Sequence, residues 1–526
     1  MRSSDPEAPL LHNGAVVGDT GDDDPPISEG SSDEHEHYSQ RAPWLRAFVL
    51  GANDGLVSGS GLVSVAALML GVGGGSEALA TMRLAGMAAW IAGALSMAVG
   101  EYISVSSQRD TEEADVEKER VQQRKGPASR ARELQELTMI YVGRGLDPGL
   151  ARQVAEQLTE KDVIRAHARD ELGINIDEMA NPLQAAVVSA FAFTAGAFLP
   201  LVAGAFISDP TTRLLAVTVA AVLGLAAFGL MGALLGGSKP LVGALRVGAG
   251  CGGCRWEAVV LFHEAPPQPE RAQDGAVARE SPAPEVSGAS REGPDEHTHY
   301  SHRGPWLRAF VLGATDGLVS VAALMLGVGG GSEALSTMRL AGIAAWIAGA
   351  LSMAVGEYIS VSSQRDTEEA DVEKERVQQT KGPEARACEL QELTMIYVGR
   401  GLDPDLARQV AEQLTEKDVI RAHARDELGI DLDEMANPLQ AAVVSGFAFT
   451  AGAVLPLLAG AFIAGSTTRL IAVAAATVLG LAAFGLAGAL LGGSKPIIGT
   501  LRVVIGGCLA MAITYGVGRL LGAGAV

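Results

Sequence analysis

The stretch GEYISVSSQRDTEEADVEKER occurs at residues 100–120 and again, unchanged, at residues 356–376, and it decides the fold of this chain. In each copy an apolar segment runs straight into a carboxylate-rich one. The apolar part predicts a membrane-spanning helix, and the charged part predicts that this helix continues into water. A row of carboxylates is therefore expected directly beneath the mouth of a membrane bundle, an arrangement that suits a cation carrier.

The two copies belong to a longer repeat. Residues 64–123 and 320–379 differ only at Ala80/Ser336 and Met87/Ile343. A helix needs roughly 20 apolar residues to cross roughly 30 Å of hydrocarbon. By this measure we expect spans at 44–72, 79–106, 183–207 and 212–236 in the first repeat, and at 306–328, 335–362, 439–464, 468–492 and 497–523 in the second. The sequence thus predicts an all-α, polytopic membrane protein with two repeats of the five-helix type.

Charged segments divide each repeat and separate it from its neighbour. Helical periodicity and Gly-Leu-Asp-Pro turns at 145–148 and 401–404 predict that the segments between the second and third spans are helical inserts. The predicted domains are an acidic disordered tail (1–43), repeat 1 (44–250, insert 107–181), a disordered linker (251–305) and repeat 2 (306–526, insert 363–437).

The first repeat is predicted to lack its fifth span. Arg246, Arg255 and Glu257 interrupt the segment that would form it, and each charge at a bilayer centre costs about 2.5–3.5 kcal/mol. In repeat 2, Arg502 and Arg519 instead bracket an uncharged segment and can reach the two interfaces. Four crossings return the linker to its starting side. Both repeats should then share one orientation, with both inserts in the cytosol.

Composition excludes several classes of partner. Hydrophobic residues make up 48% of the chain and mean hydropathy is +0.23, which is too apolar for an ordinary soluble protein of this length. The net charge of −21 argues against nucleic acid or anionic lipid as a partner. Such a chain is expected to bind cations.

Two residue types in the predicted spans point to an ion path. Asp54 and Asp316 lie in GANDGLVS and GATDGLVS, and a carboxylate inside a membrane span marks an ion or proton path by default. The alternative is a cap or turn residue at a helix break. Met97 and Met353 offer a thioether that prefers transition metals, although a single methionine more often serves packing.

The inserts carry further candidate ligands. Gln108, Glu112, Asp115 and Glu119 follow one another at spacings of four, three and four, which places them on one helix face. Such like charges repel each other unless a cation lies among them, and the alternative is a solvated charged face. Further along are two more pairs of candidate ligands, Glu133 with Glu136 and His167 with Glu171. Carboxylate, imidazole and thioether together predict Fe²⁺, Mn²⁺ or Zn²⁺.

At these residues the chain resembles the vacuolar iron transporter family, which includes yeast calcium/iron-type carriers and nodulin-21-like plant proteins. The motifs that carry the resemblance are DGLVS, SMAVGEYISVSSQRDTEEAD, ELQELTMIY and DELGI, present in both repeats. The resemblance implies five membrane helices with a cytosolic metal-binding insert, and a dimer that exchanges Fe²⁺ or Mn²⁺ for protons. It implies no prosthetic group and no enzymatic activity.

The resemblance also implies roles for particular residues. The pathway acid falls on Asp54 and Asp316, and the pathway methionine on Met97 and Met353. The glutamate ligands of the inserts fall on Glu119, Glu133, Glu136, Glu171, Glu375, Glu389, Glu392 and Glu427. His167 and His423 stand where plant iron carriers have methionine, and Gln122 and Gln378 stand where they have glutamate. These departures leave the choice between iron and manganese open.

We therefore predict a proton-coupled carrier that moves Fe²⁺, Mn²⁺ or both from the cytosol into a vacuole-like store. Its partners are the ions, protons, the lipid bilayer and, within the chain, the other repeat, which would complete a pseudo-dimer. One alternative is a membrane protein that buffers or senses metal without transport. A second is a membrane di-iron carboxylate enzyme, whose Glu-x-x-His spacing occurs only at Glu34/His37 and Glu296/His299.

Overall fold

The computed structural model describes residues 46–56, 76–207, 209–237, 304–331, 335–433 and 435–523. The regular structure of these residues is helical, and no strand occurs among them, which confirms the predicted all-α class. In repeat 1 a helical stretch over 46–56 is followed by α2 (Ser76–Arg124), α3 (Pro127–Arg144), α4 (Pro148–Asp170), η2 (Ile176–Glu178), α5 (Pro182–Phe206) and α6 (Pro210–Leu235). Repeat 2 contains α9 (Gly304–Gly331), α10 (Leu335–Thr380), α11 (Pro383–Arg400), α12 (Pro404–Asp426), α13 (Pro438–Ala461), α14 (Ser466–Leu491) and α15 (Pro496–Ala523).

Seven of the described helices contain a segment long and apolar enough to cross a membrane. They are α5, α6, α9, α10, α13, α14 and α15, and each coincides with a span predicted from the sequence. The chain is therefore an integral membrane protein with several spans. The predicted tail (1–43), the interrupted segment (241–262) and residues 251–303 of the predicted linker (251–305) lie outside the described residues, while Gly304 and Pro305 already belong to α9. The missing fifth span of repeat 1 stays a prediction.

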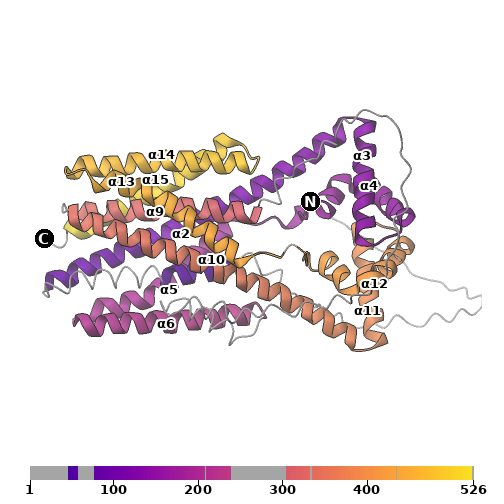
Figure 1. Ribbon diagram of the computed structural model, residues 1–526, viewed down its shortest axis with the longest axis horizontal. Coiled ribbons are helices and arrows are strands. Elements are labelled where there is room, and N and C mark those ends of the chain that lie inside the picture. The colour runs from indigo at the N-terminus through magenta and orange to yellow at the C-terminus, as the bar shows by residue number, and fades with distance from the viewer. Residues whose placement is uncertain are drawn as a thin grey trace, which may run out of the picture. The chain divides into compact units, whose positions relative to one another are not determined.

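The long helices α2 and α10 join the membrane bundle to the inserts (Figure 1). Each contains the whole repeated stretch GEYISVSSQRDTEEADVEKER without a break. At 1.5 Å per residue these helices are about 70 Å long, more than twice the thickness of the hydrocarbon core. Their charged halves therefore lie outside the hydrocarbon, as the sequence predicted.

Each insert adds a pair of helices to the charged end of a long helix. In repeat 1, α3 ends at Arg144 and α4 begins at Pro148, which confirms the predicted turn. Gly145 ends α3 with a φ of 116°, a left-handed conformation that favours glycine, and its N–H is directed at the carbonyl oxygens of Tyr141 and Val142. Pro148 then starts α4 where its missing N–H is tolerated.

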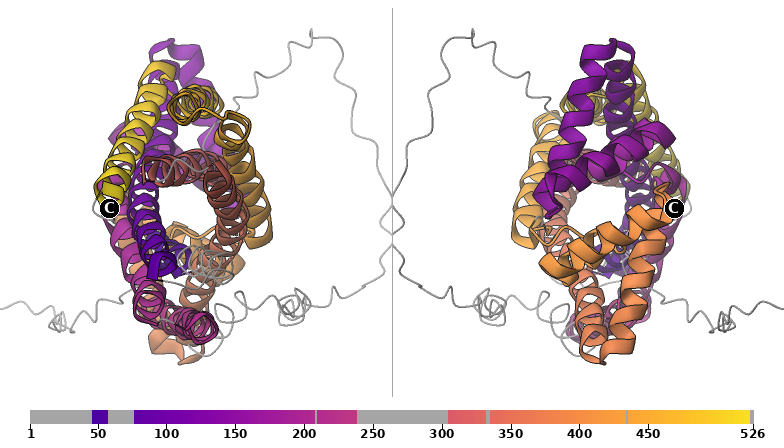
Figure 2. Two further views of the ribbon diagram at one scale, coloured as in Figure 1. Left: turned by 90° about the vertical axis from the view of Figure 1, so that its left-hand side faces the viewer. Right: turned by 90° about the vertical axis from the view of Figure 1, so that its right-hand side faces the viewer.

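The two inserts pack against each other. One apolar core contains residues of both inserts: Leu137, Tyr141, Leu150, Val154, Leu158, Leu393, Tyr397, Leu406, Val410 and Leu414. Figure 2 shows both helix pairs at the same end of the long helices. Across this contact, Arg144 lies 3.0 Å from Asp170 of its own repeat and 3.6 Å from Asp426 of the other. Such packing is expected of repeats that share one orientation.

Glycine lets the first span of each repeat approach a neighbouring helix closely. A Cβ on Gly317 of α9 would lie 2.1 Å from the carbonyl oxygen of Phe449 of α13, a distance no real side chain tolerates. A Cβ on Gly55 would likewise lie 2.2 Å from the carbonyl oxygen of Phe193 of α5. In both spans this glycine directly follows the aspartate of the DGLVS motif. The close packing therefore fixes the position of that aspartate.

Candidate functional site

The first-span aspartates are buried, and a serine of the opposite repeat binds each of them. The hydroxyl of Ser352, on α10, donates to Oδ1 of Asp54 at 2.6 Å, and the hydroxyl of Ser96, on α2, donates to Oδ1 of Asp316. Asp316 also accepts a hydrogen bond from Ser320 of its own helix. Asp316 lies inside the continuous helix α9, so the alternative interpretation as a cap or break residue is wrong for it. Asp54 lies in the helical stretch 46–56, and the residues that follow this stretch are outside the described part of the chain.

A cavity of about 50 Å³ lies between the repeats, and both aspartates line it. Trp90, Phe193 and Phe449 are among its apolar lining residues. A space of this size accommodates water or an ion of similar size. Asp54 and Asp316 are thus brought to one shared cavity, although they are far apart in the sequence.

Met97 and Met353 lie in the apolar core of the bundle. Both side chains are almost fully buried, and neither lines the cavity that the aspartates share. Each follows directly the serine that binds an aspartate of the other repeat. In this structure the methionines therefore occupy packing positions next to the predicted pathway.

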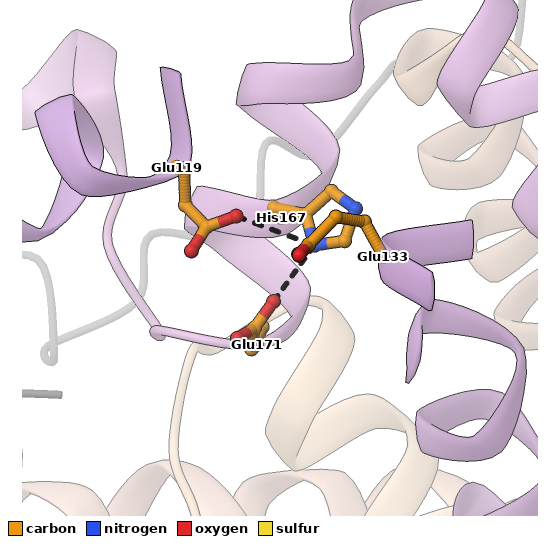
Figure 3. Close-up of side chains that lie close together, drawn as sticks. All are labelled: Glu119, Glu133, His167 and Glu171. Atoms are coloured by element: carbon orange, nitrogen blue, oxygen red, sulfur yellow. Dashed lines mark hydrogen bonds and ion pairs between the residues drawn. The ribbon is translucent and has the colours of Figure 1, made fainter. Parts of the chain in front are cut away.

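The insert of repeat 1 brings together four candidate ligands from three helices. Glu119 comes from α2, Glu133 from α3, and His167 and Glu171 from the end of α4; one ligand atom of each lies within 4.8 Å of the others. Figure 3 shows the three glutamates around the imidazole of His167. The Nδ1 atom of His167 lies 2.7 Å from Oε2 of Glu171 and 3.9 Å from Oε2 of Glu119.

The insert of repeat 2 builds the same group from Glu375, Glu389, His423 and Glu427. The Nδ1 atom of His423 lies 2.7 Å from Glu427 and 3.9 Å from both Glu375 and Glu389. Three carboxylates and an imidazole form a mixed oxygen and nitrogen donor set, which suits Fe²⁺, Mn²⁺ or Zn²⁺ better than Ca²⁺ or Mg²⁺. We call the two groups the insert clusters.

The electrostatics of the insert clusters favour positive charge. Burial alone would lower the pKa of His167, but its hydrogen bond with Glu171 and the charges of Glu171, Glu119 and Glu133 raise this pKa above its usual value. The pKa of His423 is raised for the same reasons, through Glu427, Glu375 and Glu389. Without a metal, each imidazole can hold a proton that partly compensates its carboxylates.

Glu136 and Glu392, which were also predicted ligands, lie outside the insert clusters. The buried face of α3 carries Glu133, Leu137 and Tyr141, which are four residues apart and so lie along one stripe of the helix. Glu136 is three residues from Glu133 but off this stripe, and it is only half-buried. Of this predicted pair of ligands, only Glu133 therefore lies on the buried face of α3.

The charged half of α2 has an inner and an outer face. Asp115 and Glu119 are buried, and Glu112 is half-buried with a hydrogen bond of 2.9 Å from Gln108. Glu113 and Glu117 are exposed and pair with Arg109 and Arg120 of the same helix. The alternative interpretation as a solvated charged face therefore applies to Glu113 and Glu117 but not to Asp115 and Glu119.

Two ion pairs buried at the interface of the repeats were not predicted from the sequence. Arg308 donates to Oε2 of Glu101 at 3.0 Å, and Arg46 donates to Oε2 of Glu357 at 2.9 Å. A signal for the glutamates was present, because Glu101 and Glu357 are ionisable residues inside predicted spans, as Asp54 and Asp316 are. The arginines gave no such signal, since they stand at span ends where arginine is common.

The matches to known proteins cover most of the chain. The model of the VIT family matches residues 45–259 and again residues 307–519. A protein named vacuolar iron transporter, from Acanthamoeba castellanii, is 46% identical over 228 residues, which cover 43% of this chain and 83% of that protein. Vacuolar iron transporter homolog 1 of Oryza sativa subsp. japonica is 39% identical over 237 residues, 45% of this chain and 83% of that protein. Vacuolar iron transporter homolog 2.1 of Arabidopsis thaliana is 36% identical over 231 residues, 44% of this chain and 88% of that protein.

Proposed function

Because this chain belongs to the VIT family and carries the family's domain twice, we propose that it is a carrier that moves Fe²⁺, Mn²⁺ or both out of the cytosol in exchange for protons. The names of its relatives support iron as cargo and the vacuolar membrane as its location. The inserts would face the cytosol, where the metal is collected.

The observation that carries this proposal is that α2 and α10 each hold a residue of an insert cluster and also the serine that binds a buried aspartate of the other repeat. Glu119 lies in the charged half of α2, and Ser96, which binds Asp316, lies in its apolar half. The insert clusters offer the donor types of a transition-metal site. The aspartates provide the charge that a cation or a proton needs inside a membrane.

Proton coupling would follow from competition at these carboxylates. A carboxylate that binds a divalent cation must be deprotonated, so metal and proton exclude each other at the same oxygen. An acidic store would then load Asp54 and Asp316 with protons and release the metal. The two repeats would act together as a pseudo-dimer, because each supplies one aspartate to the shared cavity.

Metal uptake into proteoliposomes that contain the full chain tests the proposal. We expect uptake of Fe²⁺ or Mn²⁺ that speeds up when the vesicle interior is acidic, with protons leaving the vesicle as metal enters. The same vesicles without protein set the background. Metal binding to the protein without uptake under any pH gradient would leave a buffering or sensing role instead.

A further inference from the structure

The four buried charges at the repeat interface form a second layer of charge on the insert side of the aspartates. Each ion pair joins the first span of one repeat to the second span of the other. The exposed fractions of the side chains are 8% for Arg308, 9% for Arg46 and 0% for both glutamates. Charges buried this deeply are costly unless they are paired, so their presence calls for a reason beyond packing.

The two ion pairs lie within range of each other's charge, and we call them together the Arg–Glu cluster: Arg46, Glu101, Arg308 and Glu357. Arg308 is subject to the charge of Arg46 as well as to those of both glutamates. Each glutamate binds an arginine through Oε2, while its Oε1 is buried and has no hydrogen-bond partner among the described residues. The cluster thus holds two buried carboxylate oxygens that could accept a cation.

The Arg–Glu cluster lies between the aspartates and the insert clusters. On α2, Glu101 is five residues beyond Ser96, about 7.5 Å along the helix, and Glu119 is about 27 Å further on. On α9, Arg308 precedes Asp316 by about 12 Å. An ion that travels from an insert cluster to Asp316 along this interface therefore passes the level of the Arg–Glu cluster.

The charges of the cluster act on such an ion in opposite ways. Two guanidinium groups in a poorly solvated interface repel a divalent cation, because Coulomb interactions are strong where water is scarce. A glutamate released by its arginine would instead attract the ion and replace part of its hydration shell. Resting on the function proposed above, we propose that the Arg–Glu cluster is a charge gate: Arg46 and Arg308 close the path to cations, and Glu101 and Glu357 receive the ion when the arginines withdraw.

Two pairs of neutralising substitutions separate a gate from a purely structural contact. Arg46→Gln with Arg308→Gln removes the barrier, and we expect several-fold faster metal uptake without a pH gradient than in the unmutated protein. Glu101→Gln with Glu357→Gln leaves unpaired arginines in the path, and we expect at least a tenfold loss of uptake while metal binding to the inserts is unchanged. The gate requires these opposite effects.

Control variants guard against loss of folding. Arg109→Gln with Glu113→Gln neutralises an exposed ion pair of the same helix α2, and it should leave uptake unchanged. Arg46→Lys with Arg308→Lys keeps both positive charges and should keep uptake low without a gradient. Changing all four residues to Gln removes the unpaired arginines, so uptake should exceed that of the glutamate variant even if the arginine variant does not fold.

The outcomes are decisive in both directions. If a folded arginine variant loses uptake as the glutamate variant does, or if the four-residue variant is no faster than the glutamate variant, the cluster is only a structural contact and the gate is wrong. A faster arginine variant with a slower glutamate variant supports it. Failure of the unmutated protein to transport any metal would instead refute the proposed function itself.

Discussion

The hydroxyl of Ser352, in the second repeat, donates a hydrogen bond of 2.6 Å to Asp54, in the first. Ser96, in the first repeat, donates the equivalent hydrogen bond to Asp316, in the second, so each repeat binds the aspartate of the other. A neutral donor stabilises the ionised carboxylate without cancelling its charge, whereas an arginine would cancel it. The aspartates can therefore remain attractive to a cation inside an apolar bundle.

Replacing both aspartates should abolish transport and spare metal capture. In Asp54→Asn with Asp316→Asn the shape is kept while the charge that attracts metal and proton is lost, so we expect uptake into proteoliposomes to fall at least tenfold. Metal binding measured by calorimetry on the same protein should not change. Asp209→Asn, at an exposed helix start where asparagine caps equally well, is the matched control. Uptake at the unmutated rate would contradict the proposed pathway.

The insert clusters should account for metal capture. Changing Glu375, Glu389 and Glu427 to Gln removes every carboxylate of one cluster, so we expect high-affinity binding of Mn²⁺ to fall to half its stoichiometry by calorimetry. Uptake should slow most at low metal concentration, because capture then limits the rate. Glu412→Gln changes an exposed residue of the same insert that pairs with Arg408, and it should bind like the unmutated protein. Equal loss in both variants would mean that the carboxylates act only through the overall negative charge.

Metal affinity of the inserts should depend on pH through their histidines. The raised pKa of His167 and His423 means that the free protein holds these protons to a higher pH than an ordinary histidine does. Metal must displace the proton, so affinity should rise with pH, and the rise should extend above the usual histidine pKa of about 6.5. His167→Met with His423→Met removes the proton competition, and a titration series should show a flatter profile. An unchanged profile would exclude the histidines as ligands.

The buried ion network between the inserts should be a large contribution to their stability. Asp170 accepts hydrogen bonds from Tyr141 at 2.9 Å and from Arg144 at 3.0 Å. Removing one partner of such a buried network costs about 3–5 kcal/mol, so Asp170→Asn should lower the unfolding temperature of the inserts clearly. Glu156→Gln breaks an exposed ion pair with Arg152 and should change the unfolding temperature little. Equal shifts of the unfolding temperature in the two variants would show that the buried network stabilises the inserts no more than the exposed ion pair does.

The same network sets how acid affects the inserts. Burial alone would raise the pKa of Asp170, but the charges of Arg144, Arg169 and Arg400 bring it below its usual value. A carboxyl whose pKa is lower in the folded state stabilises the fold above its unfolded pKa of about 3.9, and this stability is lost as the pH falls through the lower value. Circular dichroism should therefore show folded inserts at pH 5, with unfolding only in stronger acid. Asp170→Asn should remove this part of the acid transition.

The orientation of the repeats can be tested by labelling single cysteines in a cysteine-free background. Met139 and Met395 are 60% exposed on the two inserts, and Ala278 lies in the linker. If both repeats have the same orientation, impermeant reagents should reach all three from the cytosolic side. Gly524, at the C-terminus beyond α15, should be labelled from the lumenal side. A lumenal signal at Ala278 would mean that the repeats are inverted.

The sequence was sufficient to predict the repeats, the positions of the described spans, the continuous long helices and the turn at Gly145. These features depend on local hydrophobicity and turn chemistry, which each copy displays on its own. The identification with the vacuolar iron transporter family, and with it the expectation of no enzymatic activity, is confirmed by the double family match.

Contacts between the repeats could not be predicted in the same way. Periodicity shows that Leu137 and Leu393 face a core but not that they face each other's insert, because that pairing joins residues more than 250 positions apart. The Arg–Glu cluster was missed for the same reason, since a glutamate and an arginine on separate helices form a pair only in the folded chain. A spacing of three residues likewise does not reveal that Glu133 lies on the buried stripe of α3 and Glu136 beside it.

The hydrogen bonds exchanged between Asp54, Ser352, Ser96 and Asp316 have a consequence for assembly. In a carrier built from two chains, such bonds form only at concentrations where the chains associate, and dilution in the membrane breaks them. Here both halves are tethered in one polypeptide, which gives each half a high effective concentration of its partner. The paired state should therefore survive at the lowest expression levels. Each half is also free to diverge, since a change in one serine affects only one of the two aspartates.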